Sequence, residues 1–249
     1  MDLGEQLRPK TWADIVGQSK AVRQIRAITK RRGHAGTCWW FFGPSGVGKT
    51  SMARILAAEY SNEILTEETV GRDLLAETVR SMMKRIGQPT LCGNRVWIVN
   101  EAQDIPAASL SLLLDAVEQI KVSKYDMIIF TAIEHPNKAG GNGTHYHALL
   151  TRCYVPEIQD EYSTEYRQDV LAYLERVSTT HHLTSPNVKR IAENVHWSIR
   201  GALAALEMEG ILNDPGEPSQ SGPQPKGKHL PNGGDKVPEN ENNLFSLSM

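Results

Sequence analysis

Residues 43–51 constrain the fold more than any other part of the chain. They read GPSGVGKTS and satisfy the pattern G-x-x-x-x-G-K-[ST] at every fixed position. The aromatic-rich run 37–42 precedes them as an expected buried strand, and residues 52–60 follow as an expected helix. This order predicts a phosphate-binding loop, because glycines let backbone N–H groups surround an anion and a helix N-terminus adds partial positive charge.

The loop predicts a site for a nucleoside triphosphate with Mg²⁺. Lys49 would reach the β- and γ-phosphates, and the Thr50 hydroxyl would bind the metal ion. The alternative is a chance glycine-rich turn before a helix. The residues expected to hold the phosphates are Gly43, Pro44, Ser45, Gly46, Val47, Gly48, Lys49, Thr50 and Ser51.

Composition excludes several other classes of protein. Cys38, Cys92 and Cys153 lie far apart without a C-x-x-C pair, which argues against a disulfide framework or a zinc module and fits a reducing compartment. No apolar run approaches the roughly 20 residues of a membrane span, and no secretory signal is recognised. We therefore expect a cytoplasmic protein without a membrane partner.

The formal net charge of −2 does not by itself predict a polyanionic partner. Residues 19–34 nevertheless contain six basic side chains and no acid. Such a run could contact phosphates, although it more commonly forms the solvated face of a helix.

Strand and helix patterns alternate before residue 156. Apolar runs at 37–42, 96–99 and 127–131 predict strands, and helical spacing is found at 21–28, 51–60, 70–83 and 107–120. Because the strand runs are apolar on both faces, the sequence predicts an α/β fold with a parallel sheet covered by helices on both sides.

After residue 156 only helices are expected, at 165–178, 186–195 and 198–212. Residues 213–249 contain six Pro and five Gly without periodicity, a composition typical of disorder. The predicted organisation is a nucleotide-binding α/β domain at 1–155, a small helical lid domain at 156–212 and a disordered tail at 213–249.

A second nucleotide element is expected at the end of strand 96–99. In the usual arrangement an Asp holds the Mg²⁺ shell and the following Glu polarises the attacking water. Here Glu101 is in place, but Asn100 stands where the Asp belongs. An amide oxygen can accept a hydrogen bond from a metal-bound water but lacks the charge, so slow hydrolysis is expected, and Asn100→Asp is expected to speed it. The alternative is a buried strand that ends in a surface Asn-Glu pair.

The chain resembles the sliding-clamp loader subunits among the AAA+ ATPases, which include the bacterial loader ATPase and the small subunits of replication factor C. The resemblance extends from residue 7 to about 207. It rests on motifs in the same order as in that family, at residues 7–18, 43–50, 96–101, 150–153 (Leu-Thr-Arg-Cys, similar to a Ser-Arg-Cys motif) and 198–203.

The resemblance implies roles for further residues. The adenine would be bordered by Arg8, Pro9, Val16 and Gly17. Thr131 would sense the γ-phosphate, and Arg200 would reach the nucleotide of its own subunit. Arg152 would be an arginine finger for the neighbouring subunit. The implied catalytic residues are thus Glu101, Thr131 and Arg152, and the implied metal-binding residues are Thr50 and Asn100.

By this resemblance the protein would bind ATP and Mg²⁺ and act in DNA replication. Its partners would be other AAA+ subunits, a sliding clamp and primer–template DNA. Two alternatives remain open: a non-hydrolysing nucleotide-binding interaction subunit, and an AAA+ helper of recombination or transposition. The family's four-cysteine zinc module and C-terminal helical collar have no counterpart here, so the family's pentamer is not assumed.

Two further segments invite interpretation. His145 and His147 follow a glycine-rich stretch, and we expect them to be solvated in a loop rather than to bind a metal. Leu244 and Phe245 near the end of the tail resemble the apolar pair of clamp-docking peptides, although the expected Gln is absent. The alternative is an unstructured end or an end that folds back on the chain's own helical lid.

Overall fold

The computed structural model describes residues 2–133, 143–183 and 187–212. Its strands are β1 (Thr37–Phe42), β2 (Thr66–Val70), β3 (Arg95–Asn100) and β4 (Asp126–Ala132). Its α-helices are α1 (Leu3–Gln6), α2 (Ser19–Arg32), α3 (Lys49–Ala58), α4 (Ala76–Arg85), α5 (Ala107–Val122), α6 (Gly143–Leu150), α7 (Thr164–Thr180), α8 (Val188–Asn194) and α9 (Ile199–Leu212). Short 3₁₀ helices lie at Trp12–Asp14, Glu63–Leu65, Gly71–Asp73 and Ala102–Asp104.

The strands form one parallel sheet in the order β1-β4-β3-β2. Parallel strands end at the same edge, so the segments that follow β1, β3 and β4 meet there. The register places Phe41 opposite Thr131 and Val70 opposite Asn100. The predicted α/β fold with a parallel, helix-covered sheet is confirmed.

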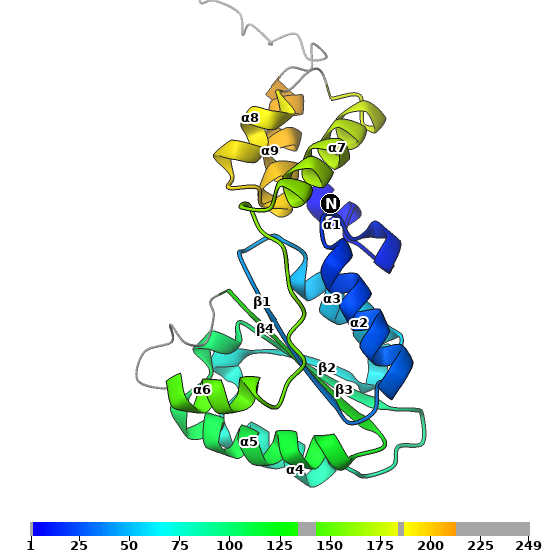
Figure 1. The fold of residues 1–249 in the computed structure, drawn as a ribbon, viewed down its shortest axis with the longest axis vertical. Coiled ribbons are helices and arrows are strands. Elements are labelled where there is room, and N and C mark those ends of the chain that lie inside the picture. The colour runs from blue at the N-terminus through cyan, green and yellow to red at the C-terminus, as the bar shows by residue number, and fades with distance from the viewer. Residues whose placement is uncertain (1, 134–142, 184–186, 213–249) are drawn as a thin grey trace, which may run out of the picture. The chain divides into compact units, whose positions relative to one another are not determined.

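Alternating side chains of the strands supply two separate cores. Helices α4, α5 and α6 lie on one side of the sheet and α2 and α3 on the other (Figure 1). Trp40, Val99 and Phe130 face the first group, whereas Trp39 and Ile98 face the second. All five side chains are fully buried. This alternation explains why the strands are apolar at consecutive positions.

The C-terminal helices α7–α9 have a core of their own. It contains Tyr166 and Leu174 of α7 and Leu206 of α9, together with Leu3 of α1 and Val47 of the loop that follows β1. The N-terminus and that loop therefore pack against the same helices. Because residues 1–214 form one compact unit, the domain boundary at 155/156 stays a prediction.

Strand β2 was not predicted, and the helix expected at 70–83 is wrong in its first half. The structure has β2 at Thr66–Val70 and begins α4 only at Ala76. The strand reads TEETV, and its two glutamates form ion pairs with arginines of neighbouring helices, Glu67 with Arg85 and Glu68 with Arg54. A search for hydrophobic periodicity does not find a strand whose side chains are mostly polar and form ion pairs.

The loop expected around His145 and His147 is also wrong in part, because both residues lie in α6 and are exposed. Tyr146 between them is 1% exposed. Its hydroxyl lies 3.0 Å from the carbonyl oxygen of Ala102 and 2.9 Å from that of Gln103, which fixes α6 to the segment after β3. Residues 134–142 and the tail, including Leu244 and Phe245, lie outside the described residues.

Within the described ranges, none of the helices combines the length and apolarity that a membrane crossing requires.

The opposite edge of the sheet contains a buried ion pair whose loss should be costly. Arg95 and Asp126 are Cα partners in β3 and β4, their side chains are 8% and 0% exposed, and Arg95 Nη1 lies 2.8 Å from Asp126 Oδ1. We predict that Asp126→Ala lowers the free energy of unfolding by about 3–5 kcal/mol, because the guanidinium stays buried without its partner. Urea titration followed by circular dichroism measures this change. Glu67→Ala is the control: it removes a pair that is more than 40% exposed on both sides and should cost at most about 1 kcal/mol. Equal losses would contradict the prediction.

Candidate nucleotide-binding site

A cavity opens at the edge of the sheet where the strands end. It is lined by residues 45–51 of the phosphate loop, the N-terminal segment and helices α7 and α9. The predicted site residues that line it are Arg8, Pro9, Val16, Ser45, Gly46, Val47, Gly48, Lys49, Thr50, Ser51, Glu101, Thr131 and Arg200. Gly17, Gly43, Pro44, Asn100 and Arg152 are not among its lining residues.

Lys49 is the central charged group of this cavity. It is the first residue of α3, its side chain is 8% exposed, and its Nζ donates to the carbonyl oxygens of Gly43 at 2.8 Å and Pro44 at 2.7 Å. Burial lowers the pKa of Lys49 from 10.5 to about 8. An ammonium group that is held by carbonyl oxygens at a helix N-terminus is suited to an anionic ligand. Gly43 and Pro44 thus hold Lys49 in place without lining the cavity themselves.

The phosphate loop touches the C-terminal helices at Gly46. Its φ of +81° favours glycine, and a Cβ at this position would lie 2.0 Å from Oγ of Ser198. Ser198 in turn accepts a hydrogen bond from the backbone N–H of Gly201 at 3.2 Å in the first turn of α9. This contact holds the start of α9, and with it Arg200, beside the loop.

A strained turn precedes Ser198. His196 and Trp197 have φ values of 51° and 59°, in the left-handed region that non-glycine residues rarely adopt. The Tyr166 hydroxyl donates to the Trp197 carbonyl at 2.9 Å and stabilises this turn.

Gly17 has a structural role in the contact with α7, while its predicted place beside adenine stays a prediction. Its φ is +70°, and a Cβ there would lie 2.4 Å from the ring of Tyr166. Because the ring of Tyr166 occupies this space, Gly17 lies under α7, whereas its neighbour Val16 lines the cavity.

Asn100 lies behind the cavity at the centre of a polar network. Its Oδ1 accepts from the Thr131 hydroxyl at 2.9 Å and from the Thr50 hydroxyl at 3.2 Å. Its Nδ2 donates to Oε1 of Glu68 at 2.6 Å. The structure thereby brings together the residues predicted to hold and sense the metal–phosphate group, and adds Glu68, which sequence reasoning missed because no strand was expected there.

Glu101 reaches the cavity through an unusual backbone conformation. Its φ is 51°, and its Oε2 accepts from Nε2 of Gln103 at 2.7 Å. Gln103 Oε1 accepts in turn from the backbone N–H of Ile133 just after β4, at 3.2 Å. Gln103 is a second residue that the sequence did not single out, and it fixes the carboxylate of Glu101.

The rim of the cavity contains acidic side chains that were not predicted. Arg8 forms two hydrogen bonds to Glu5, one of them from Nε at 3.0 Å, and this pairing lowers the pKa of the Glu5 carboxyl. Asp2, Asp14 and the apolar side chains of Ile15, Tyr173, Ile199 and Leu203 also line the cavity.

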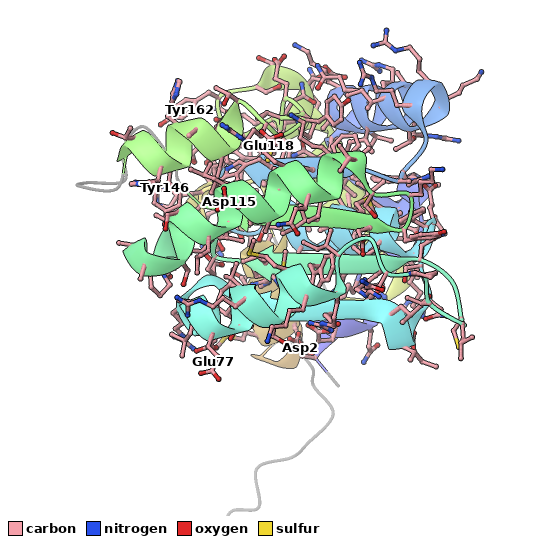
Figure 2. All side chains as sticks on the ribbon, turned by 90° about the horizontal axis from the view of Figure 1, so that it is seen from below. Asp2, Glu77, Asp115, Glu118, Tyr146 and Tyr162 are labelled. Atoms are coloured by element: carbon pink, nitrogen blue, oxygen red, sulfur yellow. The ribbon has the colours of Figure 1, made fainter. Side chains whose placement is uncertain are left out.

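Arg152 is remote from this chain's own cavity. Its Nε donates to Oε1 of Glu118 at 2.6 Å and its Nη1 donates to the Ala148 carbonyl at 2.8 Å. Glu118 lies on α5, as labelled in Figure 2. Arg152 therefore does not contact the nucleotide site of its own chain in this structure, and its role toward a neighbour stays a prediction.

The lowered pKa of Lys49 makes stability depend on pH. Between pH 8 and 10.5 the unfolded chain retains a proton on Lys49 that the folded protein has released. The free energy of unfolding of the ligand-free protein should therefore rise with pH across this range, owing to Lys49. We predict that Lys49→Met removes this contribution, measured as the difference between the pH profiles of the two proteins in urea titrations. Parallel profiles would contradict the assignment.

Comparison with known proteins places the chain among P-loop proteins. Residues 7–129, just under half of the chain, match the family model of the Holliday junction DNA helicase RuvB P-loop domain. Protein STICHEL-like 1 of Arabidopsis thaliana is 24% identical over 84% of this chain and 20% of its own length. The Holliday junction branch migration complex subunit RuvB of Wolinella succinogenes is 27% identical over 54% of this chain and 43% of its own length. The chain thus spans less than half of either relative.

Solved structures agree on the fold. The Thermotoga maritima RuvB Holliday junction branch migration motor superimposes with a TM-score of 0.58 at 18% identity, covering 81% of this chain and 64% of that protein. Together with the loop and the strand order, these similarities show that the chain has an α/β P-loop fold and that its residues 7–129 are similar to the P-loop domain of RuvB.

Proposed function

We propose that the protein binds and hydrolyses ATP with Mg²⁺ and acts on DNA in recombination. The observation that carries this proposal is the buried Lys49 ammonium, held on loop carbonyls in a cavity that Thr50, Glu101 and Thr131 also line. The matched family model and the RuvB relatives, named for Holliday junctions and branch migration, favour recombination over the clamp-loading role expected from the motifs.

The phosphate loop suits a triphosphate. Backbone N–H groups of residues 45–50, in the loop and the first turn of α3, would face the phosphates. Lys49 would neutralise the charge of the phosphates. Thr50 and Asn100 would hold the Mg²⁺ shell, and the bound ion would stabilise the charge that develops on the phosphates. Glu101, fixed by Gln103, would orient the attacking water.

The remaining wall of the cavity suits a base and ribose. Pro9, Val16, Ile15 and Leu203 supply apolar surface, and Tyr173 of α7 adds an aromatic side chain. Arg200 would reach the phosphates from α9. A nucleotide here would contact the sheet and the C-terminal helices at once.

Helix α2 supports contact with DNA. Arg23, Arg26 and Lys30 are exposed and lie at i, i+3 and i+7, on the helix face opposite the buried Ala21 and Ile25. A line of cations on one face suits the phosphates of a nucleic acid.

Clamp loading remains a second candidate because of the Leu-Thr-Arg-Cys motif at residues 150–153. Turnover measured with a four-way DNA junction and with primed DNA plus a sliding clamp separates the two functions. Stimulation by the junction alone would support recombination, and stimulation only by primed DNA with the clamp would support clamp loading. An absence of turnover with retained ATP binding would instead indicate a non-hydrolysing nucleotide-binding subunit.

We predict that binding and turnover can be separated by mutation. Lys49→Ala should abolish nucleotide binding, because it removes the cation that faces the phosphates. Glu101→Gln should retain binding and lower turnover by about 10²–10⁴-fold, the usual contribution of a positioned base. Binding is followed with a fluorescent ATP analogue and turnover by phosphate release. Lys84→Ala, which changes an exposed side chain of α4, is the control and should change neither. Unaltered binding by Lys49→Ala would contradict the site.

We further predict that Arg152 acts on a neighbouring subunit. A finger of this kind contributes about 10³–10⁵-fold to the rate, so Arg152→Ala should be nearly inactive alone. Mixing it with Lys49→Ala protein should restore part of the activity, because intact sites form where one subunit supplies the loop and the other the arginine. Glu118→Ala removes the ion-pair partner of Arg152 and of Lys121 but keeps the arginine itself, so this variant should stay active. A lack of rescue, with turnover per subunit independent of concentration, would indicate an active monomer.

A further inference from the structure

Glu68 brings a carboxylate within hydrogen-bond distance of Asn100, the residue that stands where the usual metal-site aspartate is expected. It lies on the edge strand β2, beside β3, and its Oε1 is 2.6 Å from Nδ2 of Asn100. Among the described residues, Glu68 is the one carboxylate that forms a hydrogen bond with Asn100.

The chemistry of this contact fixes the orientation of the Asn100 amide. An ionised carboxylate only accepts hydrogen bonds, so the nitrogen of Asn100 faces Glu68. The oxygen must then face the hydroxyls of Thr50 and Thr131, from which it accepts at 3.2 and 2.9 Å. Without Glu68, hydroxyls that can both donate and accept would tolerate either amide orientation.

Glu68 is itself fixed by the helix that carries the phosphate loop's lysine. Arg54 of α3 donates from Nε and Nη2 to the two carboxylate oxygens of Glu68, each at 2.9 Å. Lys49, Thr50 and Arg54 thus project from one helix, and the Arg54–Glu68 pair ties that helix to β2 and through Asn100 to β3. Such paired hydrogen bonds impose a definite geometry.

We propose that Glu68 is a positioning residue that lets Asn100 act in place of the usual aspartate, a role that rests on the proposed ATP and Mg²⁺ binding. Glu68 accepts a hydrogen bond from Nδ2 of Asn100. This bond directs the amide oxygen toward the proposed metal site and polarises the amide. Compared with the usual arrangement, the negative charge is therefore on a neighbouring strand rather than on residue 100. Groups that orient metal-site residues in this way commonly change affinity by about 10–100-fold when removed.

This arrangement revises the sequence-based expectation for Asn100→Asp. An aspartate would place a carboxylate oxygen where Nδ2 now lies, 2.6 Å from Oε1 of Glu68. Two carboxylates at this separation repel each other. Asn100→Asp alone should therefore weaken the site, and only the double change Glu68→Gln with Asn100→Asp should recover a single, correctly placed carboxylate.

Nucleotide affinity with Mg²⁺ and with EDTA tests this proposal in the full-length protein. Glu68→Ala should weaken binding of a fluorescent ATP analogue at least about tenfold in Mg²⁺ and little in EDTA. Glu68→Gln should lose less, since its oxygen can still accept from Asn100. The double variant should bind at least about tenfold more tightly than Asn100→Asp in Mg²⁺. Glu67→Ala, which removes the matched glutamate–arginine pair beside it on the same strand, should bind like the wild type.

The side-chain amide resonances of Asn100 give a second readout that needs no nucleotide. They should shift in Glu68→Ala and stay unchanged in Glu67→Ala. Wild-type affinity of Glu68→Ala in Mg²⁺, or an equal gain in Asn100→Asp with and without Glu68→Gln, would overturn the proposal. Absence of binding by the wild type would overturn the proposed function and the metal role with it, while the amide resonances would still decide the orientation of Asn100.

Discussion

The common direction of the strands is the constraint on which the site depends. Because all four run parallel, their carboxyl ends meet at one edge of the sheet. There β1 leads into the phosphate loop, β3 ends at Asn100 and β4 carries Thr131, so residues far apart in the chain meet around one cavity. The helix that follows β1 begins with Lys49, and its N-terminus faces the same edge. Reversing β3, for example, would carry Asn100 to the far edge of the sheet, away from Lys49.

The features that could be predicted from the sequence are those that follow from local patterns. The phosphate loop, the apolar strands and the helices after them follow from spacing within a few residues, and the structure bears out this α/β fold. The sequence did not reveal the roles of Glu68 and Gln103. Glu68 contacts Asn100, which is distant in sequence, and Gln103 depends on the left-handed backbone of Glu101 and on a contact with Ile133. Strand β2 has Val70 as its only aliphatic residue, and its ion pairs to Arg54 and Arg85 come from helices before and after it. Patterns of apolar residues carry no information about such pairs.

The phosphate loop contacts the C-terminal helices in two places. Val47 packs in the same core as α7 and α9, and Gly46 lies against Ser198 at the start of α9. The strained residues His196 and Trp197 precede this contact and set the direction in which α9 leaves it. Any ligand that displaces the loop must therefore displace α9 or break these contacts. This gives a physical route by which occupancy of the cavity could alter the helices.

Asn100 illustrates why a departure from a motif has to be judged in three dimensions. Taken alone, an amide in place of a carboxylate removes a charge from the metal site. In the folded protein a carboxylate lies 2.6 Å from that amide, from a strand that the sequence pattern does not reveal. The charge that matters is the one within reach of the ligand, and at this distance Glu68 acts through the amide rather than through solvent. The pair, not residue 100 by itself, is the unit that corresponds to the usual aspartate.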